Sequence, residues 1–159
     1  MPKPLYILCA ESGAVDKYTN RPSLFNVIEQ ITVNVREVPD AKVVLRIKPL
    51  DLIVIACWER EDTDSHEDVF EAEAVIAFPG QEPQIQKQPE FSLALRFHRF
   101  FIKIEGDPPQ ETGTAKLISR VRRKGSEEWI SQEYRLRFEV HNLSVSGEPL
   151  SASKESANL

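Results

Sequence analysis

Cysteine is scarce in this chain of 159 residues, and its two positions argue against a disulfide framework or a zinc site. Cys9 and Cys57 each lie inside an apolar run, where a cysteine behaves as a small hydrophobic side chain. No cluster of Cys and His residues has the spacing of zinc ligands. We therefore expect both thiols to be free and buried, as is usual in the reducing cytoplasm.

Long apolar runs and excess positive charge are also lacking. No apolar stretch approaches the ~20 residues of a membrane-spanning helix, and the N-terminal residues lack the length and cleavage site of a secretory signal. Lys and Arg number 20 against 25 Asp and Glu, and the resulting net charge of -5 is unfavourable for neutralising phosphates. These features predict a cytoplasmic protein that binds neither nucleic acid nor membranes.

Motifs of catalysis are missing as well. The sequence has no Gly-x-Ser-x-Gly, no glycine-rich phosphate loop and no His-Glu-x-x-His. The three histidines, His66, His98 and His141, lie in different expected strands or loops. Surface carboxylates such as Glu71 and Glu73 leave an unrecognised hydrolase as a remote alternative. We expect no catalytic activity and no cofactor.

What the sequence does contain is an alternation of apolar and polar residues with period two, which indicates half-buried β-strands. No window has a convincing helical period. Residues 52–58 are apolar on both faces, which is typical of a central strand. The pattern predicts an antiparallel β-sandwich of eight or nine strands with Greek-key-like connections. The expected strands are residues 5–10, 24–35, 43–47, 52–58, 70–78, 91–97, 100–104, 115–121 and 134–140.

Two segments interrupt this alternation. Residues 81–89 are polar and contain prolines, which predicts a long surface crossover. At His98–Arg99 the pattern slips by one residue, which predicts a bulge or a short corner there, and we favour a bulge that buries both Phe100 and Phe101. The alternative is that Phe101 points outward as an interface anchor.

The predicted domain comprises residues 1–143. The remaining residues, 144–159, are small and polar, so we expect a disordered tail.

The loop Glu11 to Ser23 lies between two apolar strands and raises the question of whether it is an active site. Its turn-forming residues, Asp16, Asn20 and Pro22, favour the turn of a β-hairpin instead. Such a loop reaches outward, so we take Asp16 and Arg21 as candidate interface residues.

The residues around this loop carry a resemblance. Cys9-Ala10, Val15-Asp16 and the run Ser23-Leu24-Phe25-Asn26-Val27-Ile28 make residues 5–35 similar to a family of uncharacterised bacterial proteins of similar length. The resemblance implies a β-sandwich and no assigned activity.

The acidic stretch 61–73 is the one candidate metal site. Asp62, Asp64, Asp68 and Glu73 have spacings that partly mimic a calcium loop. Against this, Glu67 stands where a glycine makes the sharp turn, and the flanks have the period of strands. We favour a solvated acidic hairpin, with binding of Ca²⁺ or a small ligand as the alternative.

A basic stretch lies further along the chain, where Arg120, Arg122 and Lys124 share one face of an expected strand. This face can bind an acidic partner, or it can protect an edge strand from unwanted pairing. Its charge is opposite to that of residues 59–73, so the two stretches could meet in a homo-oligomer. The sequence thus favours a non-catalytic binding or scaffolding module that acts through protein–protein contacts.

Overall fold

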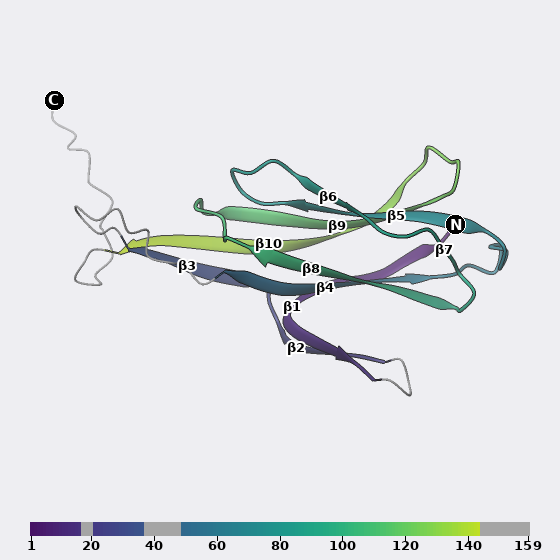
Figure 1. The fold of residues 1–159 in the computed structure, drawn as a ribbon, viewed down its shortest axis with the longest axis horizontal. Coiled ribbons are helices and arrows are strands. Elements are labelled where there is room, and N and C mark those ends of the chain that lie inside the picture. The colour runs from purple at the N-terminus through teal and green to yellow at the C-terminus, as the bar shows by residue number, and fades with distance from the viewer. Residues whose placement is uncertain (17–20, 37–48, 144–159) are drawn as a thin grey trace, which may run out of the picture.

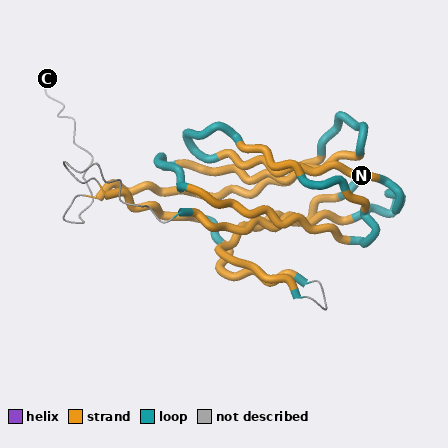
Figure 2. The backbone as a smooth tube through the Cα atoms, in the orientation of Figure 1, coloured by secondary structure: helices purple, strands orange, loops and turns teal. Residues whose placement is uncertain are grey.

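The computed structural model shows two β-sheets stacked face to face (Figures 1 and 2) and describes residues 1–16, 21–36 and 49–143. The four-stranded sheet has the order β2 (Pro22–Val27), β1 (Lys3–Val15), β4 (Leu50–Glu59) and β8 (Phe97–Gly106). The other sheet has the order β3 (Gln30–Arg36), β10 (Ile130–Leu143), β9 (Gly113–Arg123), β5 (Val69–Ala77) and β6 (Gln84–Lys87), and β7 (Phe91–Ser92) also pairs with β5. The predicted β-sandwich is confirmed. All neighbouring strands are antiparallel except β3 and β10, which run parallel.

The core lies between the two sheets, and the strands fill it with alternate side chains. On β4 every second residue from Leu50 to Trp58 is buried against the other sheet. Ile55 and Cys57, on the other face of β4, are also fully buried, which confirms the prediction of a central strand. Cys9 and Cys57 are both free and buried, as expected.

The prediction of a single strand over residues 24–35 is wrong. The segment forms two strands, and each belongs to a different sheet: β2 pairs with β1, and β3 pairs with β10. Asn26 adopts a positive φ of 54°, a conformation that asparagine tolerates better than most residues, shortly before the chain changes sheets. The hairpin itself is confirmed, although its strands reach Val15 and resume at Pro22, so that the loop is shorter than expected.

Of the bulge or short corner predicted at His98–Arg99, the bulge is wrong. β8 pairs with β4 in one unbroken register from Phe97 to Gly106, and it buries Phe100 while leaving Phe101 44% exposed. The alternation slips because residues 91–97 are not one strand: β7 belongs to one sheet, and the chain then crosses to the other to begin β8.

The expected surface crossover, residues 81–89, contains the exposed strand β6. The expected strand 43–47 and the tail 144–159 lie outside the described residues.

Candidate binding surface

Strand β8 forms one edge of the four-stranded sheet, and in the described part of the chain it pairs only with β4. Its side chains alternate strictly because the register has no bulge. Phe100, Ile102 and Ile104 are buried in the core. The alternate residues of β8 lie on the outer face of the sheet: Arg99, Phe101, Lys103 and Glu105.

Large apolar side chains gather at the start of this strand. Leu95 is 68% exposed, Phe97 40% and Phe101 44%. Together with His98 and Arg99 they line a hollow of about 180 Å³. We call Leu95, Phe97, Arg99 and Phe101 the β8 patch. Exposed apolar side chains that cluster in this way are typical of interaction sites.

The guanidinium of Arg99 adds a polar feature to the β8 patch. Its Cζ lies 6.0 Å from the ring centroid of Phe97. Its Nε is buried and has no hydrogen-bond partner among the described residues. The neighbouring Arg96 is held by Glu59 at 2.7 Å, so that carboxylate is already engaged. A buried donor without an acceptor is costly. Arg99 as a whole is only partly buried, and guanidinium groups bind carboxylates well.

The basic and acidic stretches of the sequence meet within the chain. Glu73 lies directly opposite Arg120, and Glu71 opposite Arg122, on the neighbouring strands β5 and β9. The closest nitrogen–oxygen distance is 2.6 Å in both pairs. The ring of Trp129 covers the two guanidinium groups, with centroid distances of 4.7 and 4.5 Å.

These contacts bear on both interpretations of the basic stretch, which were binding of an acidic partner and protection of an edge strand. β9 is an interior strand, so the prediction of a protected edge is wrong. Lys124 is paired as well, with Glu90 at 2.8 Å. The opposite charges of the two stretches therefore pair within one chain.

Reversing one charge of this ladder gives a first prediction. We expect Arg120→Glu to lower the free energy of unfolding by about 1–2 kcal/mol, because like charges then face each other across the strands. Adding Glu73→Arg to the same chain should recover most of the loss, as measured by urea denaturation. A double variant no more stable than Arg120→Glu would contradict the direct pairing.

The acidic stretch does not form the predicted solvated hairpin throughout. The carboxylate of Asp64 is buried, lies 2.6 Å from the N-terminal ammonium and accepts the backbone N–H of Glu61 at 3.1 Å. Asp68 pairs with Arg123 at 3.0 Å. Of the calcium ligands of the alternative, Asp64 and Asp68 both contact Arg123, whereas Glu73 belongs to the ladder of the sheet and pairs with Arg120. Among the described residues no group of three carboxylate, His or Cys side chains is arranged to hold a metal ion.

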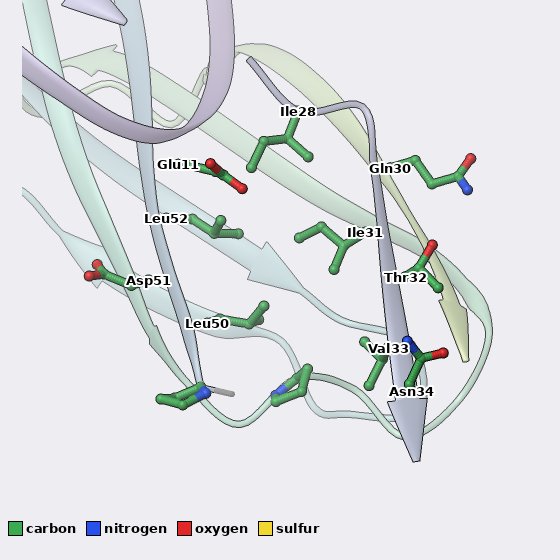
Figure 3. Close-up of a pocket in the computed structure, with 12 residues that line it drawn as sticks. Glu11, Ile28, Gln30, Ile31, Thr32, Val33, Asn34, Leu50, Asp51 and Leu52 are labelled. Atoms are coloured by element: carbon green, nitrogen blue, oxygen red, sulfur yellow. The ribbon is translucent and has the colours of Figure 1, made fainter. Parts of the chain in front are cut away.

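A cleft of about 660 Å³ lies between β3 and the beginning of β4 (Figure 3). Apolar side chains of Ile28, Ile31 and Leu52 point into it, and Gln30 points away. The carboxylate of Glu11, which accepts a hydrogen bond from Asn26 at 2.8 Å, belongs to its lining. No pattern in the sequence indicates this cleft, because the cleft depends on how β1, β3 and β4 come together.

The candidate interface residues of the sequence are not brought together. Asp16 and Arg21 flank the loop of the β1–β2 hairpin, which projects from the sandwich (Figure 1), and the Asp16 N–H donates to the Arg21 carbonyl at 3.0 Å. β2 and β8 are opposite edges of their sheet, so the hairpin lies far along the sheet from Phe101. Arg120 belongs to the other sheet. Of these candidates, Phe101 alone lies in the β8 patch.

No protein-family model matches the chain, and neither does any curated protein sequence. The resemblance of residues 5–35 to a bacterial family therefore stays a prediction. In the described ranges, no helix has the length and apolar character needed to cross a bilayer.

Proposed function

We propose that this protein is a non-catalytic, cytoplasmic binding module that holds a protein partner on the β8 patch. The supporting observation is the gathering of three exposed apolar side chains around the partly buried Arg99, whose Nε has no acceptor in the described part of the chain. Aromatic residues and arginine dominate the binding energy of protein interfaces, and they act best when they are clustered. A partner that covers Phe97 and Phe101 with apolar atoms and offers an oxygen to Arg99 would suit this surface.

Binding of a small apolar ligand in the cleft is the alternative. The volume of the cleft lies within the usual range of ligand pockets, and the side chains that point into it are mostly apolar. The cleft differs from the β8 patch because residues of both sheets line it.

The variant Phe101→Asp tests the proposal. The side chain is exposed, so the fold should be kept, while a carboxylate at the centre of the β8 patch should weaken partner binding at least ~30-fold. The partner is first recovered from native cell extract with the affinity-tagged wild-type protein, and its affinity for each purified variant is then measured by titration calorimetry.

Ile85→Asp is the matched control. Ile85 is 56% exposed on β6, in the other sheet, so its substitution introduces the same charge without touching the β8 patch. We expect this control to bind like the wild type. Equal affinity of the Phe101→Asp variant, with an unchanged melting temperature, would contradict the proposal and favour the cleft.

A further inference from the structure

Strand β8 is the longest edge strand among those that the structure describes. It spans ten residues, whereas the other sheet edges, β2, β3 and β6, span six, seven and four. Its pairing with β4 shows no register shift, and it contains no proline. Long edge strands without these interruptions are templates for pairing with another chain.

The charges along β8 decide which chain can pair with it. On the outer face the order is Arg99, Phe101, Lys103 and Glu105, so positive charge lies at one end and negative charge at the other. An antiparallel partner with the same order presents these charges reversed. The strand is therefore complementary to itself.

We propose that two copies of this protein pair through β8, antiparallel, with Ile102 facing Ile102 of the second copy on a two-fold axis. A two-fold axis perpendicular to the sheet keeps the outer faces of both copies on one side. Arg99 then lies opposite Glu105 of the second copy, and Phe101 opposite Lys103. On the core side, Phe100 faces Ile104. Opposite charges and apolar pairs that face each other directly stabilise antiparallel strands.

Other registers of the same kind are less favourable. With Phe101 on the axis, Arg99 faces Lys103 of the second copy, and with Lys103 on the axis the two lysines face each other. With Phe100 on the axis no opposite charges meet. With Ile104 on the axis Lys103 faces Glu105, but only residues 102–106 pair, against residues 98–106 in the proposed register. The proposed register alone combines ion pairs with nearly the full length of β8.

Such pairing joins the two four-stranded sheets into one continuous sheet. The β8 patches of both copies then lie on the same face of that sheet. The dimer goes beyond the proposed function, since it forms whether or not a protein partner binds.

Charge reversal tests this register. We expect the wild-type protein to sediment as a dimer of two 18.1 kDa chains at tens of micromolar. Glu105→Arg places two arginines opposite each other at both ends of the paired strands and should weaken the dimer at least ~10-fold. Glu105 is an exposed side chain, so the variant should fold normally. Arg99→Glu should have the same effect through two facing carboxylates.

Mixing the two variants provides the decisive measurement. In a heterodimer, Glu at position 99 faces Arg at position 105, and the native Glu105 faces the native Arg99, so an equimolar mixture should dimerise although neither variant does so alone. A monomeric wild-type protein, or single variants that dimerise as the wild type does, would overturn the proposal. Phe101→Asp places a carboxylate opposite Lys103 and should keep the dimer, so loss of the partner and loss of the dimer are separable.

Discussion

Replacing Trp58 with alanine is expected to lower the free energy of unfolding by about 4 kcal/mol, because it empties the centre of one of the two core clusters. Trp58 is fully buried and packs in this cluster with Phe70, Leu93 and Phe100. Its indole N–H donates to the hydroxyl of Ser119 at 3.1 Å, and Ser119 itself is buried. The substitution therefore removes a large apolar side chain and leaves that hydroxyl without its donor.

Denaturation in guanidinium chloride measures this loss, with Trp129→Ala as the matched control. Trp129 is only partly buried and contacts the guanidinium groups of the ladder, so its removal should cost less than about 2 kcal/mol. Similar losses for both variants would contradict the central role of Trp58. A double-mutant cycle with Trp58→Phe and Ser119→Ala isolates the hydrogen bond, since each single change leaves one polar group unpaired and the double change leaves none.

The sequence predicts well those strands that can be recognised from their own residues, without knowing which strands pair with them. Residues 52–58 are apolar on both faces of the strand, and burying both faces requires a central position in a sheet, whichever strands are its neighbours. In the same way, the alternation over residues 70–78 and 134–140 identified β5 and β10. Local pattern suffices for these strands because one buried face repeats every second residue.

The errors arise where the chain changes sheets. Residues 24–35 keep their alternation across Asn26 and Glu29, although β2 and β3 belong to different sheets, and residues 91–97 do the same between β7 and β8. The parity is right in β3, where Val33 is buried, but Phe25 and Val27 of β2 and Phe97 of β8, which the alternation placed on a buried face, are 53%, 50% and 40% exposed. Joining two strands into one therefore also assigned the wrong face to some of their residues. Strand order is set by pairings between residues far apart in sequence, and periodicity carries no information about those pairings.

The candidate site, too, depends on which strands pair with each other, and the sequence pattern does not show this. An outward-facing Phe101 was one of two alternatives at residues 98–101, and the structure decides for it because β8 is unbroken. The acidic and basic stretches looked like two surfaces, yet β5 and β9 are neighbours and their charges pair. Asp64 looked like a solvated loop residue, and it is buried against the N-terminal ammonium.

The stability of the protein is expected to fall by about 2 kcal/mol through Cys9 alone as pH rises from 9 to 11. Burial raises the pKa of the Cys9 thiol from its ordinary value of 9.0 to about 11, while a backbone hydrogen bond at Ala10 acts weakly in the opposite direction. The folded protein thus holds this proton more tightly than the unfolded chain does. Its stabilising contribution is complete below pH 9 and is lost as pH rises toward 11, because the unfolded chain forms the thiolate first.

The variant Cys9→Ala isolates this contribution, since alanine does not titrate. Burial also raises the pKa of Tyr134, and the charge of the Cys9 thiolate adds to that rise. The comparison is therefore made in two chains that both carry Tyr134→Phe, so that Cys9 is the only one of the two groups that titrates. At pH 7.5 the chain that keeps Cys9 should be the more stable, because the thiol fills its place in the core. Toward pH 11 the difference in stability between the two proteins should vanish or reverse, as measured by denaturant unfolding at each pH. A difference that stays constant would contradict burial of the protonated thiol.

Alkylation of Cys9 by iodoacetamide at pH 8 should, for the same reason, be at least ~100-fold slower than in the unfolded chain, because only the thiolate reacts.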